Sequence, residues 1–326
     1  MNAVDHNNVV IFDDRGIPSI MCRFVRPKDT EEVPAVFKIG DKVADAIYIS
    51  KYPNIVIDGR AYSMPMADPT VNITFDGAVQ ACRCKGLGWH LMTAVEYEYL
   101  LNQSREKGTM PHGNTDWGKD YYHNDEQGKV SNLGRTYTGT GPVTWNHDHT
   151  PYGVSDLNGN VWEWLAGLRI KDGVIEFIPD NKAASPYCDL SKDSAEWQQA
   201  ETSKGPVRAN VECGEITITD AVAADDYEPD YDGVRIEKLE VELSEIPQVL
   251  KDLGIIPDKR AEEEGKTYVY FDATEGEYMP VRGSAFCNSS SSGPSALGLN
   301  GPRSYSGDNI GFRSAFYEVN GKLITE

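Results

Sequence analysis

The stretch GVSDLNGNVWEW, Gly153–Trp164, decides the fold of this 326-residue chain. Asp156 and Asn158 favour a turn, and Gly159 can adopt backbone angles that are closed to other residues. Residues 161–164, VWEW, predict a short strand whose two tryptophans contribute heavily to a core. A structural role therefore accounts for most of this motif.

A second motif, WHLMTAVEYEYL at Trp89–Leu100, predicts the start of a helix. Thr93 can cap this helix, and Glu96, three residues later, is the partner expected in a capping box. A second helix is predicted near 76–85. The spacing also predicts a buried stripe on the first helix, made of Val95, Tyr99 and Leu100.

The segment Arg282–Arg313, RGSAFCNSSSSGPSALGLNGPRSYSGDNIGFR, has an unusual composition. Lys, Glu, Gln, Met and Trp make up 60 of the 326 residues, yet none of them occurs among the 26 positions 284–309. Randomising the two adenines of an asparagine codon while its final pyrimidine is kept can yield Phe, Ser, Tyr, Cys, Pro, Gly, Ala, Asp or Asn, among other types, but never one of the five missing types. The pattern therefore indicates adenine-directed mutagenesis.

The residue types that this codon rule allows define a set of candidate variable, ligand-binding positions. These positions are Phe286, Cys287, Ser289, Ser291, Pro294, Ser295, Gly298, Asn300, Gly301, Tyr305 and Gly307. A Gly/Ser-rich surface loop is the plainer interpretation, since low charge is ordinary in such loops. Interleaved apolar residues favour a packed segment instead; they are Ala296, Leu297, Leu299, Ile310 and Phe312.

Three motifs, at 89–100, 153–164 and 311–313, follow one another in the order found in formylglycine-generating enzymes, and the chain resembles that family from about 46 to 316. The resemblance implies an α+β, C-type-lectin-like fold of the formylglycine-generating-enzyme (sulfatase-modifying factor) type, with short antiparallel strands, two helices and long loops. Within that fold, positions 284–309 are similar to the variable region of proteins diversified by retroelements, a class that includes phage receptor-binding proteins.

The resemblance also implies partners and a location. A protein of this class binds a protein or glycan on a target cell surface, as a homo-oligomer or in many copies on one particle. It is made in the cytoplasm without a signal peptide and becomes part of the virion, associated with the tail. Individual sites built from small residues should bind with modest affinity, at micromolar concentrations or weaker, so that strength comes from several copies.

The enzymes of the resembled family use two cysteines a few residues apart, in the segment matching 286–294, to bind copper and activate oxygen. Here only Cys287 is present, so a two-sulfur copper site cannot form. Family enzymes can also bind calcium through ligands that match Asp156 and Glu163, although a buried Glu163 satisfied by backbone donors is the alternative. We expect no cofactor, no metal and no catalytic residue.

Other constellations of polar residues give no enzyme signature. Residues 147–149, His-Asp-His, lie in a Thr/Asn-rich loop and are expected to face solvent. Glu96 and Glu98 are two positions apart on a helix, so they occupy different faces and cannot act together as an acid and a base. The sequence contains no P-loop, no G-x-S-x-G and no H-E-x-x-H.

Composition excludes several classes of partner. The formal charge of −20 weighs against binding to nucleic acid or anionic lipid, because phosphate contacts need clustered Lys and Arg. The chain has neither an apolar run of membrane-span length nor the pattern of a secretory signal. Six cysteines without CxxC pairs predict reduced, mostly buried thiols. The acidic clusters at 225–232 and 262–264 are expected to be solvated.

The chain is expected to begin with an N-terminal segment, residues 1–41, that serves attachment or oligomerisation. Short strands are predicted at 9–12 and 20–25, on either side of the turn at 13–16, Asp-Asp-Arg-Gly.

Residues 42–326 are expected to form the C-type-lectin-like ligand-binding domain. Loops rich in Gly, Asn and Thr fill 107–150, and an insertion at about 171–266 precedes the variable region at about 284–309. The insertion contains a predicted helix at 246–253, which starts with a proline and stops at a glycine, but its role cannot be read from sequence.

The favoured hypothesis is a non-enzymatic binding protein in which a rigid frame holds variable surface residues. Tyr305 and Phe286 would supply apolar anchors, and the serines and Asn300 would supply adaptable hydrogen bonds. A carbohydrate-binding lectin of fixed specificity is the alternative, and a formylglycine-generating-like oxidase is a further one. The predicted frame consists of Gly159, Trp162, Trp164, Gly311 and Phe312.

Overall fold

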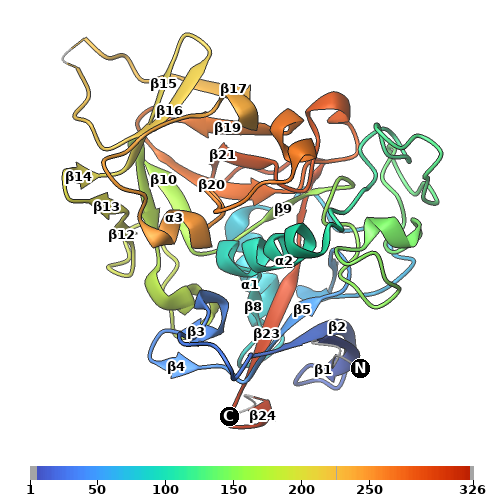
Figure 1. Ribbon diagram of the computed structural model, residues 1–326. Coiled ribbons are helices and arrows are strands. Elements are labelled where there is room, and N and C mark those ends of the chain that lie inside the picture. The colour runs from blue at the N-terminus through green and yellow to red at the C-terminus, as the bar shows by residue number, and fades with distance from the viewer. Residues whose placement is uncertain (1–5, 225, 324–326) are drawn as a thin grey trace.

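A computed structural model describes residues 6–224 and 226–323 of the chain. Two β-sheets form the body of the molecule, and the two longer helices lie between them (Figure 1). In this view the smaller sheet lies below and the larger one above. The mixture of sheets with few helices agrees with the predicted α+β class.

The smaller sheet joins the N-terminal strands to the C-terminal part of the chain, in the order β1-β2-β5-β23-β24, with β8 paired to β23. The strands predicted at 9–12 and 20–25 are confirmed as β1 and β2, which pair antiparallel. The strands of this sheet are β1 His6–Phe12, β2 Pro18–Val25, β5 Ala46–Ser50, β8 His90–Leu91, β23 Ser314–Val319 and β24 Lys322–Leu323.

The larger sheet follows the order β17-β19-β21-β20-β10-β11-β15-β16-β18, with β9, β12 and β22 attached beside this path. Its strands are β9 Trp162–Trp164, β10 Leu168–Lys171, β11 Val174–Phe177, β12 Gln198–Gln199, β15 Arg208–Glu212, β16 Glu215–Thr219, β17 Tyr231–Arg235, β18 Glu240–Glu242, β19 Tyr268–Asp272, β20 Glu277–Arg282, β21 Leu297–Pro302 and β22 Ile310–Phe312. The predicted insertion thus supplies strands to the same sheet that carries the variable region.

The remaining elements are short. Three two-stranded ribbons are β3 Lys38–Ile39 with β4 Lys42–Val43, β6 Ile55–Ile57 with β7 Arg60–Tyr62, and β13 Glu201–Thr202 with β14 Gly205–Pro206. The 3₁₀ turns are η1 Ala35–Phe37, η2 Val143–Trp145, η3 Pro179–Ala184, η4 Ile236–Lys238, η5 Glu262–Lys266 and η6 Ser289–Ser291. No helix in the described ranges is both long and apolar enough to cross a bilayer.

The three helices in the described part of the chain lie where the sequence predicts them, near 76–85, 93–105 and 246–253, with ends that differ by one or two residues. Helix α1, Phe75–Arg83, starts behind Thr74, and α2, Ala94–Lys107, starts behind Thr93 with the full capping box to Glu96. Helix α2 ends at Gly108, whose positive φ of 65° suits a glycine. The insertion helix is confirmed as α3, Gln248–Asp252, with Pro247 before it.

The chain passes directly from the larger sheet back to the smaller one at Arg313. Strand β22 lies in the larger sheet and β23 in the smaller one, and only Arg313 separates them. The Arg313 guanidinium is fully buried and forms two hydrogen bonds to the Glu163 carboxylate of β9, at 2.5 and 2.6 Å. It also donates to the carbonyl oxygens of Ser50 and Ser155, at 3.0 and 3.1 Å. This side chain therefore fixes how the two sheets meet.

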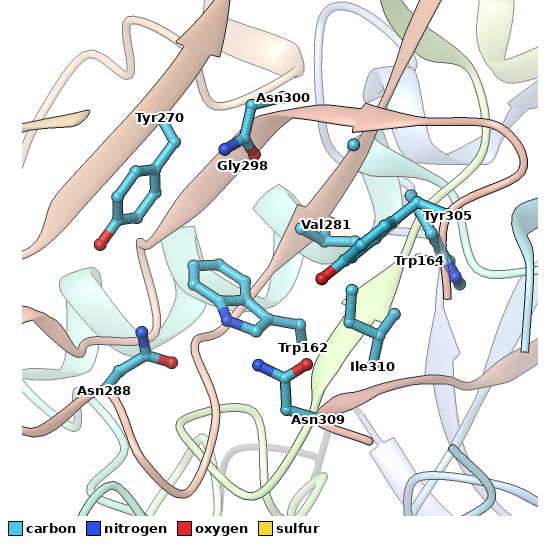
Figure 2. A pocket seen from close by; sticks show the side chains of 11 residues that line it. Trp162, Trp164, Tyr270, Val281, Asn288, Gly298, Asn300, Tyr305, Asn309 and Ile310 are labelled. Atoms are coloured by element: carbon cyan, nitrogen blue, oxygen red, sulfur yellow. The ribbon is translucent and has the colours of Figure 1, made fainter. Parts of the chain in front are cut away.

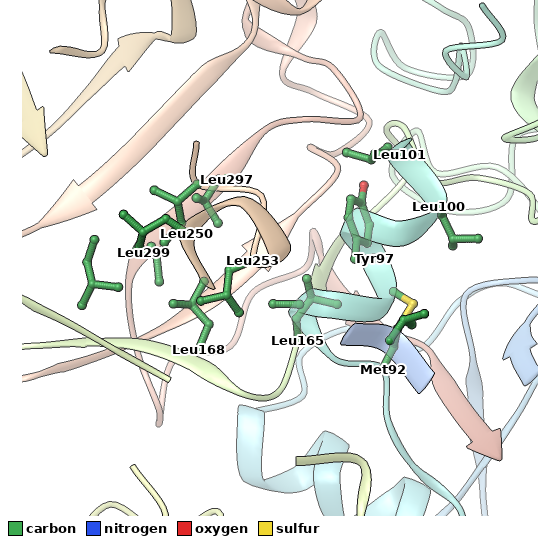
Figure 3. Close-up of a cluster of buried hydrophobic side chains, with 14 of the residues drawn as sticks. Met92, Tyr97, Leu100, Leu101, Leu165, Leu168, Leu250, Leu253, Leu297 and Leu299 are labelled. Atoms are coloured by element: carbon green, nitrogen blue, oxygen red, sulfur yellow. The ribbon is translucent and has the colours of Figure 1, made fainter. Parts of the chain in front are cut away.

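The main hydrophobic core fills the space between the sheets, and Figure 3 shows its centre. Of the predicted α2 stripe only Leu100 is fully buried; Val95 and Tyr99 are half-buried at its margin, and Tyr97 and Leu101 occupy the core instead. Core residues of α3 and β21 join this cluster: Leu250, Leu253, Leu297 and Leu299. The packed segment predicted around Leu297 and Leu299 is thereby confirmed.

Two expectations of solvent exposure are wrong. His147 is fully buried, and its ring nitrogen accepts a hydrogen bond from the backbone N–H of Val154 at 2.9 Å. Glu264 is also buried, because Arg105 of α2 reaches its carboxylate at 2.8 Å. Loop composition predicted exposure at 147–149 and charge clustering predicted it at 262–264, but His147 has a partner seven residues away and Glu264 has one 159 residues away.

Lys85 predicts a pH dependence of stability. Its ammonium is buried over the Trp89 ring, 3.2 Å from the centroid, and donates to Ser19 at 2.8 Å. Burial lowers the pKa of Lys85 to about 7, whereas the unfolded chain keeps the ordinary value near 10.4. Between pH 7 and 8.5 the Lys85 side chain therefore keeps its proton in the unfolded chain but loses it in the folded protein. Because the unfolded state then binds more protons, the free energy of unfolding should rise with pH, by up to about 1.4 kcal/mol per pH unit.

Urea unfolding of the protein and of Lys85→Met at pH 7.0, 7.75 and 8.5 measures this slope. The variant lacks the titrating group, so its unfolding free energy should change less over the same range. Equal slopes for the two proteins would contradict the assignment to Lys85.

Candidate binding site

A surface pocket of about 460 Å³ opens over the middle of the larger sheet (Figure 2). Strands β9, β19, β20, β21 and β22, together with the loops that flank β21 and β22, supply its walls. The lining residues are Trp162, Trp164, Tyr270, Val281, Asn288, Gly298, Asn300, Gly301, Tyr305, Asn309 and Ile310. The volume is in the range of small-molecule sites.

Strand register builds the floor of this pocket. Gly298 of β21 lies opposite Tyr270 of β19 on one side and opposite Val281 of β20 on the other. Val281 in turn pairs with Trp164 of β9. Trp162, two residues earlier on β9, pairs with Ile310 of β22. Gly298 is buried, and a Cβ added there would lie 2.9 Å from Val281 Cγ2, so the absence of a side chain lets β21 pack closely against β20 beneath the pocket.

The floor is rigid and the rim is exposed. Trp164 is fully buried, and its indole N–H donates to the carbonyl oxygen of Ile73 at 2.9 Å. Trp162 is 7% exposed and meets the Tyr270 ring edge to face, with centroids 6.3 Å apart. Across the pocket Tyr305 is 47% exposed, and Asn300 on the rim is also exposed.

The pocket is polar without being charged. None of its lining residues is Asp, Glu, Lys, Arg or His, and burial raises the pKa of the Tyr270 hydroxyl above its usual value. Its polar groups are the hydroxyls of two tyrosines and the amides of Asn288, Asn300 and Asn309. Each amide carries both donors and an acceptor, so the pocket can bond neutral polar groups of either kind.

Four of the eleven candidate variable positions line this one pocket: Gly298, Asn300, Gly301 and Tyr305. Gly307 lies beside it, since a Cβ added there would be 3.5 Å from the Tyr305 hydroxyl. Cys287 is exposed, and Ser289 and Ser291 are half-buried in η6. The candidate positions from 298 to 307 therefore lie in or beside one pocket, whereas those from 286 to 295 do not line it.

Besides Gly298, which is buried in the pocket wall, three candidate positions are buried away from solvent. The expected anchor Phe286 is only 3% exposed, because its ring packs edge to face on Trp117 with centroids 5.0 Å apart. Pro294 is buried, and its carbonyl oxygen accepts from the Tyr97 hydroxyl at 2.8 Å. Ser295 is 1% exposed and bonds the buried Glu264 carboxylate. A residue-type rule cannot detect such burial, which depends on distant partners.

A sequence profile of the sulfatase-modifying factor enzyme 1-like domain matches residues 55–317, well over half of the chain. The chain belongs to this family. The predicted α+β, C-type-lectin-like fold of the formylglycine-generating-enzyme type is thereby confirmed.

Among curated relatives, the formylglycine-generating enzyme of Mus musculus is 36% identical over 105 residues, which are 30% of this chain and 27% of that protein. PvdO from Pseudomonas aeruginosa superposes with a TM-score of 0.38 and 13% identity over 95% of this chain and 98% of that one. The I1 variant of the Major Tropism Determinant gives a TM-score of 0.35 and 12% identity over 97% of this chain and 56% of that one.

The position expected for copper chemistry in this family holds a single thiol. All six cysteines are free, and burial raises the pKa of Cys287, which disfavours its thiolate. Within residues 6–224 and 226–323 no group of three or more His, Cys, Asp or Glu side chains is arranged to hold a metal ion. This family member therefore lacks, in its described part, the paired sulfur ligands that the chemistry needs.

The carboxylates considered for calcium have internal partners. Glu163 binds Arg313, as described above, and Asp156 accepts a hydrogen bond from the backbone N–H of Gly139 at 2.9 Å. Backbone donors were the expected partners of Glu163, but an arginine takes that place. Glu163 thus helps to join the two sheets, and Asp156 holds the loop 137–140.

Sequence reasoning missed several lining residues. Asn288 and Asn309 lie within 284–309 but were not among the candidates, although asparagine itself obeys the codon rule. Tyr270 lies outside that segment, and only the parallel pairing of β19 with β21 brings it to the pocket. Trp162 was assigned to the frame alone, whereas it both supports the sheet and lines the pocket.

The glycines of the segment predict where side chains can be added. Gly301 has an ordinary φ, and an added Cβ would make ordinary contacts with the Trp164 ring at 3.4 Å and the Tyr305 ring at 3.6 Å. Gly283 has a φ of 91°, and its Cβ would lie 2.5 Å from the carbonyl oxygen of Leu157. Gly301→Ala should therefore change the unfolding free energy by less than about 0.5 kcal/mol, whereas Gly283→Ala should cost more than about 1 kcal/mol. Chemical denaturation of both variants measures the difference, and comparable losses would contradict the distinction between pocket and frame.

Proposed function

We propose that this chain is a non-enzymatic receptor-binding protein whose pocket residues are diversified by a retroelement through adenine-directed mutagenesis. The observation that carries the proposal is the convergence of Gly298, Asn300, Gly301 and Tyr305, all chosen by a codon rule, on one pocket. Strand β21 and the turn after it carry these four positions to the pocket, and the proposal rests on them and not on the seven other candidates.

The frame supports this use of the pocket. Predicted frame residues lie beneath or beside the variable ones: Trp162 and Trp164 lie on the strand next to β20, and Gly311 and Phe312 belong to β22. Alternation along β21 sends Leu297 and Leu299 into the core and leaves Asn300 exposed. Residues at the rim can therefore change while the core that orders them stays the same.

Location on a phage tail, binding to a target cell surface and attachment through residues 1–41 are parts of the same proposal. In Figure 1, β1 and β2 lie at the end of the molecule away from β21. If the first strands hold the protein on a particle, the pocket would face outwards. A homo-oligomer or a multicopy array would then raise the strength of weak individual sites.

An oxidase related to the family's enzymes is the second candidate, because family membership favours it. The geometry supports it less well. Cys287 is a single exposed thiol whose pKa is raised, and the pocket beside it is lined by aromatic rings and amides. We therefore propose binding in place of catalysis.

Sequencing codons 284–309 in many independent copies of the gene, with the flanking DNA, tests the proposal. We expect a nearby template repeat with adenine-rich codons and substitutions concentrated at 298, 300, 301, 305 and 307. Position 295 should keep small polar residues, since its hydroxyl bonds Glu264. An invariant segment without a template would refute diversification.

A further inference from the structure

We infer that the pocket binds an uncharged pyranose ring of a cell-surface glycan, and that this ligand class stays the same when the variable residues change. The inference names the ligand class of the site under the proposed function and rests on that function for its biological role. The binding chemistry itself stands on the geometry of the pocket.

The absence of charged lining residues selects a neutral ligand. A carboxylate, phosphate or ammonium group inside the pocket would lose water without meeting an opposite charge, which is unfavourable. The nearest strong base along this segment is Arg303, and its guanidinium is already bound to Glu277 at 2.8 Å and to Asp76 at 2.7 Å. The formal charge of −20 further disfavours acidic ligands.

The aromatic rings suit the apolar face of a sugar. Trp162 forms the floor, with Tyr270 on one side and Tyr305 on the other (Figure 2). The C–H groups on one face of a pyranose can pack against such rings, while its hydroxyls point outwards along the ring edge. A flat ring with one apolar face therefore matches the floor better than a fully polar molecule does.

The amides separate a sugar from an apolar protein side chain. Asn288, Asn300 and Asn309 surround the aromatic floor. A sugar hydroxyl both donates and accepts, as does an amide, so several hydroxyls can be paired at once. Asn288 Oδ1 already accepts a hydrogen bond from the Ala285 N–H at 2.7 Å, so the pocket offers chiefly the NH₂ group of Asn288 and the amide of the exposed Asn300, and an apolar Leu or Phe side chain would use neither. The combination of rings and amides favours the saccharide.

The aromatic floor lies outside the segment 284–309, because Trp162 belongs to β9 and Tyr270 to β19. Asn300 and Tyr305 are candidate variable positions within that segment. The aromatic floor should therefore pack against a pyranose in every variant. Changes at the rim would select which sugar, or which linkage, is bound.

An array of purified neutral and acidic glycans, probed with the labelled full chain, is the first test. It is followed by ligand-observed NMR titration with the methyl glycoside of the best neutral sugar and with methyl glucuronide as the charged probe. We expect millimolar binding of at least one neutral glycoside and at least fivefold weaker binding of the glucuronide. Tyr305→Ala and Asn309→Ala should each weaken neutral binding at least fivefold, while thermal melts show that both variants fold.

Tyr187→Ala is the matched control, because Tyr187 is a 74% exposed tyrosine outside the pocket; it should bind like the parent. The inference is overturned if no neutral glycan binds, if the glucuronide binds as well as the neutral sugar, or if both pocket variants bind normally. In another outcome the parent protein binds a purified protein receptor and no glycan, and Tyr305→Ala loses the receptor. That result would overturn the inference and leave the proposed function standing. Glycan binding in the pocket with invariant codons would support the inference and refute diversification.

Discussion

Arg313→Met should lower the free energy of unfolding by about 3–5 kcal/mol, the cost expected when one partner of a buried ion pair is removed. Arg313 and Glu163 are fully buried and joined by two hydrogen bonds. The variant leaves the Glu163 carboxylate without its partner and also frees the carbonyl oxygens of Ser50 and Ser155. Urea or guanidinium denaturation of parent and variant at pH 7 measures the loss.

The pH dependence of this loss identifies its cause. Burial already raises the pKa of Glu163 in the parent protein, and without Arg313 that pKa should rise further. A folded-state pKa above the unfolded value gives stability that is present at low pH and is lost as pH rises through the folded pKa. The difference between parent and variant should therefore shrink from pH 7 to pH 5. A constant difference would indicate lost packing alone.

The double variant Glu163→Met/Arg313→Met provides the control. With both charges removed, no ion remains buried without a partner, so the double variant should be more stable than Arg313→Met alone. A double variant that loses as much as the sum of both single changes would contradict the pairing.

Local chemistry made much of the fold predictable. Thr93 and Glu96 are three residues apart and form the expected capping box, and Pro247 marks the start of α3. Alternation at Leu297 and Leu299 predicted a packed strand, which β21 confirms. These signals work because each depends on neighbours within a few residues.

Long-range pairing explains what could not be predicted. Glu264 looked like part of a solvated acidic cluster, but Arg105, 159 residues away in sequence, neutralises it. Ser295 then bonds the same carboxylate and is drawn inside. No pattern within the segment indicates such partners, so the candidate variable set combines four of the eleven lining residues of the pocket with positions that are buried elsewhere.

The wall of the pocket also depends on long-range pairing that the sequence does not reveal. Tyr270 reaches the site only because β19 lies parallel to β21 with Tyr270 opposite Gly298. Parallel strands need a long connection, and the register between them is not marked by a turn motif. Sequence composition could therefore single out candidate positions within 284–309, whereas the opposite wall of the pocket could be found only from the pairing of the sheet.

Trp164→Ala should also cost about 3–5 kcal/mol of unfolding free energy, as large-to-small aromatic substitutions in cores do. The ring is fully buried, packs edge to face on Phe75 with centroids 6.2 Å apart, and bonds the Ile73 carbonyl oxygen. Its far edge also supports the pocket, 3.4 Å from the position of a Cβ on residue 301. Binding should fall together with stability, because the floor loses its support.

Trp164→Phe separates the two roles of this side chain. Phenylalanine keeps a ring in the core but cannot donate to Ile73, so the variant should lose less stability than Trp164→Ala. Its retained ring should also preserve more of the pocket. Thermal and chemical denaturation of both variants, with glycan titration of the folded proteins, distinguishes these effects. An unchanged melt for Trp164→Ala would show that this tryptophan is not part of the frame, and the assignment of a fixed floor beneath a variable rim would then fail.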